Sequence, residues 1–319
     1  MSVESYDGET VYEEGIDYLV EGDELVIPEG SHIPVTGWDT FLYPDFDTAK
    51  KAGEASEFAK DFGPLVTTNG KFLNLCAIGN PKLVTEKQIA VTYKATKKEL
   101  LSAPESQLDK LPKLSAKLEA GEPVKIVLYG DSVCCGCDCS GMYGQKPGQP
   151  TWAELLFHQM EEKWQSPVCF HSTSVGGVDS EWAIENSSQR AANFHPDLVI
   201  LGFGMNDRCG MEEYRNKTGR LMEAIRKVSP KTEFLLIAST LPNELAATEP
   251  HHFWAHQDEY SESLKGLEGM GVAIADIQAV QKEIGKRKRY IDITGNWLNH
   301  PNDYLARILA QVVIKTLGM

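Results

Sequence analysis

The chain has 319 residues, of which 42% are hydrophobic and 24% charged, and its formal net charge is -15. This composition is that of an ordinary globular protein, and the length exceeds that of a typical single domain. The acidic net charge argues against phosphate binding, which requires clustered Lys and Arg, so we expect no nucleic-acid partner and no membrane partner.

The first fifteen residues are polar and acidic, without the basic and apolar regions of an export signal. No run of about 18 apolar residues predicts a membrane-spanning helix. The cysteines number seven, and four of them crowd into a short stretch, which makes a poor disulfide framework. These observations favour a cytoplasmic protein. The crowded cysteines are Cys134, Cys135, Cys137 and Cys139.

Residues 16 to about 95 hold short β-type runs that are broken by turn residues. A Glu-Gly-Asp turn lies between the runs 16–20 and 24–28, which predicts a hairpin. Further strands are predicted for residues 71–79 and 87–95. We therefore predict a small β-sandwich. A polar, proline-punctuated segment, residues 96–123, follows it, and it divides the chain into an accessory domain with its linker, 1–120, and a second domain, 121–319.

The second domain alternates predicted strands with helical periods. This alternation predicts an α/β fold with a mainly parallel sheet. Apolar residues recur at helical spacing from Tyr214 to Val228 and from Leu305 to Leu317, the latter ending before Gly318. The predicted strands are residues 124–129, 168–172, 198–202, 233–238 and 272–274.

Four short blocks follow predicted strands or precede predicted helices. GDSVCCG presents Ser132 directly after the strand 124–129, and STSVGG ends at Gly177. GMND, which contains Asn206, follows the strand 198–202, and NHPND opens the last helix with His300. In open α/β sheets, ligands bind at the carboxyl ends of the strands, so we expect these blocks to meet there.

Together the blocks supply what acyl transfer needs: a nucleophile, a base for its proton, and donors aimed at the oxyanion. Ser132 would attack the acyl carbon, and His300 would act as general base and then as general acid. The backbone N–H groups of Ser132 and Gly177 and the side-chain amide of Asn206 would hold the oxyanion. This chemistry requires no cofactor.

In the order and approximate spacing of these four residues, the second domain resembles the SGNH (GDSL-type) hydrolases. The resemblance implies a flavodoxin-like, three-layer α/β/α domain that hydrolyses an ester, a thioester or an amide. The first domain resembles the jelly roll or sandwich that precedes the catalytic domain in two-domain carbohydrate acetylesterases.

One position departs from the family pattern. The family usually places an Asp three residues before the histidine, where this chain has Trp297. Loss of that acid costs a serine protease about 10⁴-fold in turnover, so a working enzyme needs a substitute. Some similar two-domain acetylesterases use a backbone carbonyl, here that of Trp297; Asp292 and Asp303 are the other candidates. We predict a Ser132/His300 dyad.

The cysteines beside Ser132 invite a metal hypothesis, because Cys134 and Cys137 form one CxxC pair. There is no second such pair, and adjacent cysteines converge poorly on one tetrahedral ion, so we expect no metal. Packing beneath the nucleophile is the simpler interpretation, and a redox role stays open.

Aromatic residues near the predicted site could stack on sugar rings or pack in the core. We name Asp131, Trp152 and Trp182 as candidates for substrate contact. Residues 241–260 are a candidate substrate-selecting lid. This segment contains Trp254 and three histidines, His251, His252 and His256.

The sequence thus predicts a serine esterase that removes small acyl groups, above all acetyl, from a small-molecule or oligosaccharide ester through an acyl-Ser132 intermediate. One alternative is a lipid- or thioester-directed enzyme, against which the mixed, His-rich lid segment weighs. The other is a degenerate, non-catalytic glycan-binding protein, against which the complete oxyanion hole weighs. An oligomer is compatible with the sequence.

Overall fold

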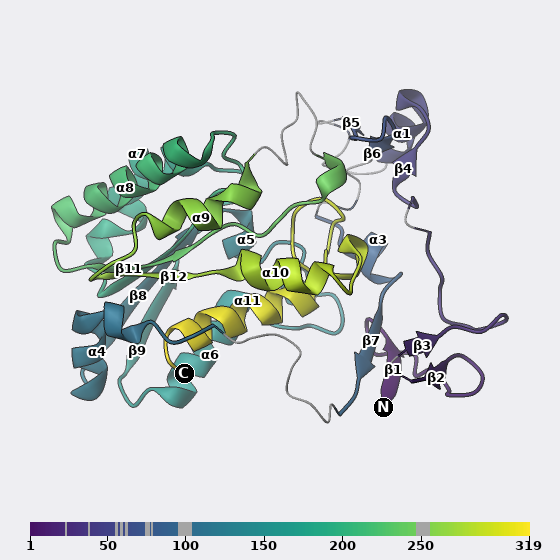
Figure 1. The fold of residues 1–319 in the computed structure, drawn as a ribbon, viewed down its shortest axis with the longest axis horizontal. Coiled ribbons are helices and arrows are strands. Elements are labelled where there is room, and N and C mark those ends of the chain that lie inside the picture. The colour runs from purple at the N-terminus through teal and green to yellow at the C-terminus, as the bar shows by residue number, and fades with distance from the viewer. Residues whose placement is uncertain are drawn as a thin grey trace.

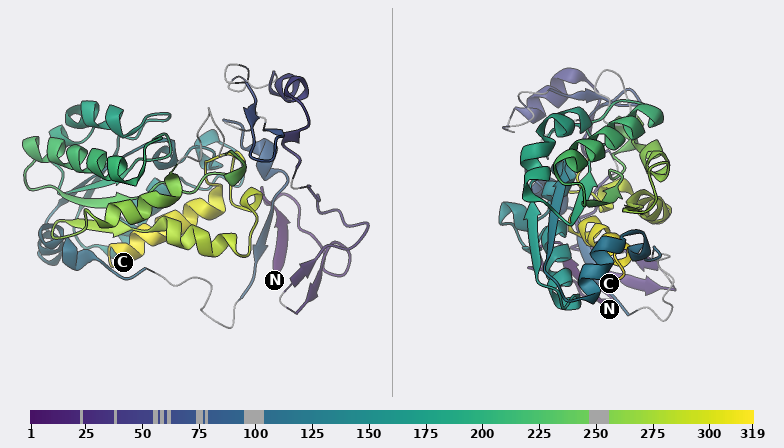
Figure 2. Two further views of the ribbon diagram at one scale, coloured as in Figure 1. Left: turned by 45° about the horizontal axis from the view of Figure 1, so that its top comes forward. Right: turned by 90° about the vertical axis from the view of Figure 1, so that its left-hand side faces the viewer.

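The computed structural model describes residues 1–22, 24–37, 39–54, 57, 60, 63–73, 77, 79–94, 104–246 and 256–319. Figure 1 shows a layered α/β part and, beyond the carboxyl ends of its strands, a group of smaller amino-terminal elements. Figure 2 places the amino-terminal elements at the same end of the layered part.

The central sheet contains five parallel strands in the order β12-β11-β10-β8-β9. Numbered along the chain, this order is 2-1-3-4-5, the flavodoxin-like doubly wound arrangement. All five predicted strands are confirmed, to within a residue or two at their ends. They are β8 (Val124–Gly130), β9 (Val168–Ser172), β10 (Leu198–Gly202), β11 (Glu233–Ile237) and β12 (Val272–Ala275).

Helices cover both faces of this sheet, so the predicted three-layer α/β/α fold is confirmed (Figure 2). Successive side chains of a strand point to opposite faces, so Ile126 packs in one core and Val127 in the other. The first core includes α4 (Pro112–Glu119), α6 (Trp152–Lys163), α10 (Ile277–Gly285) and α11 (Asp303–Thr316). The second includes α7 (Ser180–Arg190), α8 (Met211–Val228) and α9 (Tyr260–Lys265).

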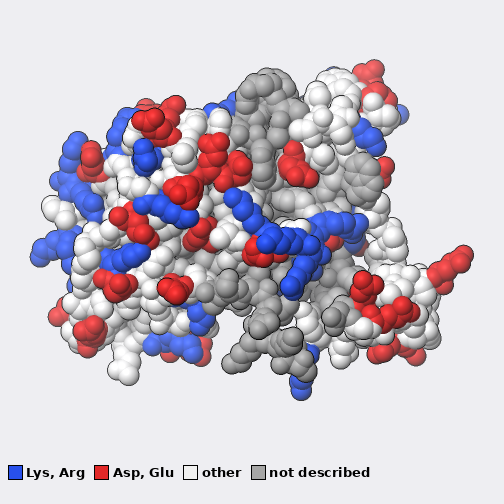
Figure 3. Space-filling model, viewed as in Figure 1, with Lys and Arg blue, Asp and Glu red and all other residues white. Residues whose placement is uncertain are grey.

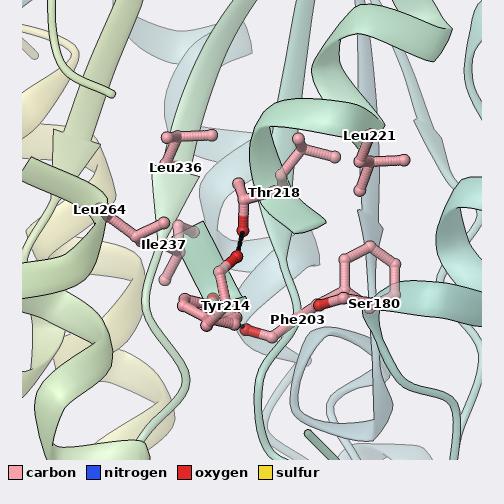
Figure 4. A pocket seen from close by; sticks show the side chains of 9 residues that line it. Ser180, Phe203, Tyr214, Thr218, Leu221, Leu236, Ile237 and Leu264 are labelled. Atoms are coloured by element: carbon pink, nitrogen blue, oxygen red, sulfur yellow. Dashed lines mark hydrogen bonds between the residues drawn. The ribbon is translucent and has the colours of Figure 1, made fainter. Parts of the chain in front are cut away.

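A small cavity lies in the second core, and Figure 4 shows it from close by. The Tyr214 hydroxyl donates to the Phe203 carbonyl at 2.8 Å, and the Thr218 hydroxyl donates to the Tyr214 carbonyl at 3.0 Å. The first of these bonds ties α8 to the chain that follows β10, and the second lies within α8. The cavity is enclosed by the core and is not the place where the four sequence blocks meet.

Three small antiparallel sheets form the amino-terminal part. The predicted hairpin is confirmed as β2 (Leu19–Glu21) and β3 (Glu24–Val26). The predicted β-strand character of this part agrees with these sheets. The predicted sandwich is not seen among the described residues, because turn residues keep the strands too short for broad sheets. Part of the predicted strand 71–79 lies outside the described residues. The other strands are β1 (Ser2–Ser5) with β7 (Ile89–Thr92), and β4 (Leu42–Tyr43), β6 (Phe72–Leu73) and β5 (Leu65–Val66).

Short helices complete the fold. Of these, α5 carries the residues of greatest interest, and η6 leads into the loop that holds His300. They are α1 (Phe46–Gly53), α3 (Lys82–Thr85), α5 (Ser132–Cys135), η1 (Leu108–Lys110), η2 (Gly141–Tyr143), η3 (Ala192–Phe194), η4 (Glu244–Ala246), η5 (Gln257–Glu259) and η6 (Tyr290–Asp292).

The amino-terminal part shares a hydrophobic core with the loop that precedes His300. Phe41 and Leu73 pack there with Ile291, Trp297 and Leu298. The rings of Phe41 and Trp297 lie 5.4 Å apart, centroid to centroid. This core joins chain segments that are more than two hundred residues apart.

The segment before β8 docks on the α/β layers. Leu111 and Leu114 are fully buried in the first core. The buried Glu233 carboxylate accepts from the backbone N–H groups of Lys113 and Leu114, at 3.1 and 2.9 Å, and so caps α4 from β11. A carboxylate is favourable at a helix amino terminus, which explains its burial there.

The surface mixes charges of both signs (Figure 3). A basic group lies over α10 and the chain after it, where residues 286–289 are four consecutive exposed Lys or Arg residues. Among the described helices, none has the length and apolar character needed to cross a membrane.

Candidate active site

The chain turns sharply between β8 and α5. Asp131 caps α5, and its carboxylate accepts from the N–H of Val133 at 3.0 Å and of Met205 at 3.2 Å. Burial raises the pKa of Asp131 to about 7. The prediction that Asp131 contacts substrate is therefore corrected: the buried side chain ties the Ser132 turn to the loop after β10.

Cys134 packs between the ends of β8 and β10. Its thiol donates to the Gly202 carbonyl at 3.3 Å, and a Cβ on either Gly130 or Gly202 would lie 2.4 Å from its sulfur. Glycine at both strand ends therefore makes room for this thiol. Cys139 is also buried in the first core, which agrees with the packing interpretation for these two residues.

Cys135 and Cys137 are partly exposed thiols on the same turn. A hydrogen bond from the Cys137 thiol lowers the pKa of Cys135. Within the described part of the chain, no group of three or more His, Cys, Asp or Glu residues is arranged to hold a metal.

Ser132 and His300 lie within hydrogen-bond distance, although they are far apart in sequence. The distance from Ser132 Oγ to His300 Nε2 is 2.9 Å. The other ring nitrogen, Nδ1, lies 2.5 Å from Oδ2 of Asp138. A carboxylate only accepts, so Nδ1 carries the proton and Nε2 presents its lone pair to the serine hydroxyl. A chain of hydrogen bonds thus runs from the Ser132 hydroxyl through the His300 ring to the Asp138 carboxylate.

Asp138 lies on the loop after α5 and is fully buried. Its backbone φ is +64°, a left-handed conformation that Asp tolerates better than most residues. The second carboxylate oxygen, Oδ1, accepts from the backbone N–H of Gly79 at 3.0 Å. A Cβ on Gly295 would lie 2.3 Å from the Asp138 carbonyl, so only glycine fits where the His300 loop crosses it.

The His300 loop is held by its own side chains. Oδ1 of Asn296 accepts from the backbone N–H groups of Leu298, Asn299 and His300 at 2.9 to 3.1 Å. The Thr294 hydroxyl donates to the His300 carbonyl at 2.9 Å. The loop thus fixes the backbone from which the imidazole projects.

None of the three predicted substitutes for the triad acid contacts His300. The Trp297 carbonyl accepts from the Asn243 amide at 2.9 Å, and Asp292 pairs with Arg289. Asp303 accepts from the N–H and the hydroxyl of Ser140, at 2.8 and 2.7 Å. These candidates, and the dyad that they accompanied, are corrected in favour of Asp138.

Sequence reasoning missed Asp138 because it lies among the cysteines. A signal was nevertheless present: Asp138 is the single charged residue between Ser132 and Tyr143, in a stretch that must pack beneath the nucleophile. A lone carboxylate in such a segment needs a buried partner, and a histidine is one.

The predicted oxyanion donors come from loops that are joined to one another. Nδ2 of Asn206 donates to the Val178 carbonyl at 2.9 Å, which links the loop after β10 to the loop that carries Gly177. A Cβ on Gly176 would lie 3.7 Å from the Cβ of Ser132, so this loop passes beside the nucleophile. Among the described residues, the N–H groups of Ser132 and Gly177 find no hydrogen-bond acceptor.

The predicted substrate contact of Trp152 is corrected, and that of Trp182, which is partly buried, stays a prediction. Trp152 is fully buried, and its indole N–H donates to the Val133 carbonyl at 2.8 Å, so it supports α5 from below. Trp182 packs against Tyr129 in the second core, with ring centroids 6.5 Å apart. Trp254, His251 and His252 of the predicted lid lie outside the described residues.

Residues 128–308, more than half of the chain, match the model of the GDSL-like lipase/acylhydrolase family. The match begins within β8 and ends within α11, so it contains Ser132, Asp138, Gly177, Asn206 and His300. A search of the curated proteins finds no match.

Solved structures share the fold. One is a two-domain esterase (CEX) active on acetylated mannans, co-crystallized with mannopentaose, with 19% identity and a TM-score of 0.52; the match covers 67% of this chain and 54% of that one. Another is Axe2, an acetylxylan esterase from Geobacillus stearothermophilus, with 16% identity and a TM-score of 0.50 over 62% of this chain and 96% of that one. The chain thus spans about half the length of the two-domain esterase.

Proposed function

This chain belongs to the GDSL-like lipase/acylhydrolase family and is a hydrolase, and from that premise we propose that it is a serine esterase that removes small acyl groups, above all acetyl, from carbohydrate esters. The observation that carries the proposal is the pair of hydrogen bonds from Ser132 through His300 to Asp138. The groups are within reach for proton transfer, and the base is oriented by a third group.

In the first half of the reaction, Ser132 Oγ attacks the acyl carbon while His300 Nε2 takes the hydroxyl proton. Asp138 accepts from Nδ1 and stabilises the imidazolium that forms. The N–H groups of Ser132 and Gly177 and the free N–H of the Asn206 amide donate to the oxyanion. The carbon–oxygen bond to the sugar then breaks, and the sugar oxygen takes the proton from Nε2.

In the second half, water attacks the acyl-Ser132 ester and gives a proton to His300 Nε2. The tetrahedral intermediate collapses, Ser132 Oγ regains the proton, and the carboxylic acid leaves. The site returns to its starting protonation state without an oxidant, a metal or a cofactor entering the balance.

Carbohydrate esters are the proposed substrates because the similar folds include esterases described as active on acetylated mannans and on acetylxylan. The hydrogen-bonded Asp138 also supports a hydrolase over a glycan-binding protein, since binding alone needs no oriented base. A cytoplasmic location is part of the proposal, supported by the free thiols of six described cysteines.

The test is hydrolysis of nitrophenyl acetate by the full chain and by the Ser132→Ala variant. We expect the wild-type chain to release nitrophenol with an initial burst as acyl-Ser132 accumulates, and the variant to lose both burst and turnover. Equal rates in the two proteins would exclude Ser132 as the nucleophile.

Acetylated xylan and mannan oligosaccharides, an acyl-CoA and a lysophospholipid then separate the substrate classes. We expect the highest kcat/KM on an acetylated oligosaccharide. A higher value on the thioester or the lysophospholipid would replace carbohydrate with that class.

A further inference from the structure

Two residues of the amino-terminal part make hydrogen bonds to the loops that carry His300 and Asp138. The backbone N–H of Gly79 donates to Oδ1 of Asp138 at 3.0 Å. The side chain of Gln88 donates to the carbonyls of Ile291 and Thr294 at 2.5 and 2.9 Å. All three bonds cross from the first hundred residues to the loops of the candidate active site.

Gln88 is buried, and its side-chain amide is fully used. Its two N–H groups reach the two carbonyls before His300, and its Oε1 accepts from the side-chain amide of Asn302 at 3.0 Å. An amide has two donors and one acceptor oxygen, so this set fixes its orientation. Gln88 lies directly before β7, which pairs with β1 and is thereby anchored in the amino-terminal part.

These bonds close the base of the His300 loop. Thr294 and Pro301 face each other as an antiparallel bridge, and His300 directly precedes Pro301. Gln88 holds the chain before this bridge through the carbonyls of Ile291 and Thr294, and the chain after it through the side chain of Asn302. The position of the imidazole therefore depends on a side chain that itself touches neither Ser132 nor the ring.

Gly79 acts on the other partner of His300. One oxygen of the Asp138 carboxylate faces Nδ1, and the other accepts from Gly79, so the plane of the carboxylate is set from both sides. Hydrogen bonds to a charged group are about twice as strong as neutral ones, which makes this contact effective at orienting the acid.

We infer that the amino-terminal part is a working component of the catalytic apparatus, in which Gln88 is the positioning residue for His300 and the Gly79 N–H positions Asp138. This inference rests on the proposed function. A displacement of about 1 Å at a reacting group can cost about 10²-fold in rate, so loss of the Gln88 bonds lowers turnover rather than substrate binding.

Gln88→Met tests the inference, because Met matches Gln in length and volume but makes none of the three hydrogen bonds. We expect kcat on nitrophenyl acetate to fall about 10- to 100-fold, with KM within about 3-fold of wild type. Gln107→Met is the matched control: Gln107 accepts from the N–H of Ile274 at 2.9 Å, at the amino-terminal side of α4 and away from the His300 loop. It should keep wild-type kcat.

The double variant Asp138→Asn/Gln88→Met distinguishes a loss of His300 positioning from a general structural defect. In Asp138→Asn the imidazole has already lost its orienting partner, so adding Gln88→Met should cost little further in kcat. A structural defect would instead multiply the two losses. Equal kcat in Gln88→Met and wild type, or equal losses in the Gln88 and Gln107 variants, would overturn the inference.

A spectroscopic measurement makes the inference independent of turnover. The His300 Nδ1 proton, hydrogen-bonded to Asp138, should give a downfield proton resonance in wild type and Gln107→Met that is lost or shifted in Gln88→Met. An unchanged resonance in the folded Gln88 variant contradicts the inference. An inactive wild-type chain with that resonance in place would instead contradict the proposed function.

Discussion

His300 is held at both ring nitrogens by residues of one segment, the turn and loop that follow β8. Nε2 faces Ser132, which begins a helix, and Nδ1 faces Asp138, whose left-handed backbone aims the carboxylate inward. Because Asp138 is fully buried, its hydrogen bond is not weakened by water. Asp138 therefore fixes the ring tautomer in which Nε2 presents its lone pair to Ser132.

Asp138→Asn should lower kcat on nitrophenyl acetate by about 10⁴-fold while the fold survives, because the amide favours the wrong imidazole tautomer. Circular dichroism and steady-state kinetics of the purified variant check this. Asp292→Asn is the control, since Asp292 pairs with Arg289, and it should keep wild-type kcat. Normal turnover in the Asp138 variant would return the site to a dyad.

The meeting of Ser132 and His300 could be predicted because each stands in a short block beside a strand or helix end. Asp138 was missed because the local sequence marks it only as a lone charged residue and does not show where the His300 loop lies. Trp152 was misassigned for a related reason. Its place near the site in the sequence suggested that it stacks on a sugar ring, whereas its indole is fully buried and supports α5.

At the scale of elements, Asp131 joins the turn between β8 and α5 to the loop after β10. The strands themselves follow from β-branched and alternating apolar residues, which is why all five were predicted. The connection that Asp131 makes between the turn after β8 and the loop after β10 was not predicted, because Gly-Asp-Ser is equally typical of a simple turn.

Asp131 should make folding stability depend on pH. An unfolded Asp loses its proton near pH 4, whereas in the fold burial raises the pKa of Asp131 to about 7. Between pH 4 and pH 7 the folded chain binds one proton more at Asp131 than the unfolded chain does. Protonation of Asp131 therefore contributes fully to folding stability below about pH 4, and this contribution is lost as the pH rises through 7.

Urea unfolding of wild type and Asp131→Asn at pH 5 and pH 8 measures this contribution. The stability of wild type relative to the variant should be greater at pH 5 than at pH 8. Comparing the two proteins at each pH cancels the other titrating groups. A relative stability that is the same at both pH values would mean that Asp131 is ionised throughout.

At the scale of the whole molecule, the amino-terminal part and the His300 loop share one core. Phe41 is 5% exposed and packs on Trp297, which is 4% exposed. The sequence indicated a change of pattern near residue 96 and hence a separate accessory unit. It could not show this shared core, because packing between distant segments leaves no periodicity in either of them.

Phe41→Ala should lower the free energy of unfolding by about 3–5 kcal/mol, the usual cost of such a core deletion. Because the core is shared, calorimetry should show one transition for the whole chain, at a lower temperature than in wild type. Val11→Ala is the control, since Val11 is 70% exposed and should leave the midpoint unchanged. Two transitions, with only one moved by Phe41→Ala, would show two independent units.

The loop that carries Asp138 has a consequence for protein engineering. Ser132 and Asp138 both lie on the turn and loop after β8, so the proposed nucleophile, the proposed acid and one proposed oxyanion donor belong to a single continuous segment. A designer who transfers residues 130–141 to another parallel-sheet scaffold moves all three together. The recipient then has to supply a histidine, a glycine at the crossing point that Gly295 occupies here, and a backbone donor in place of Gly79.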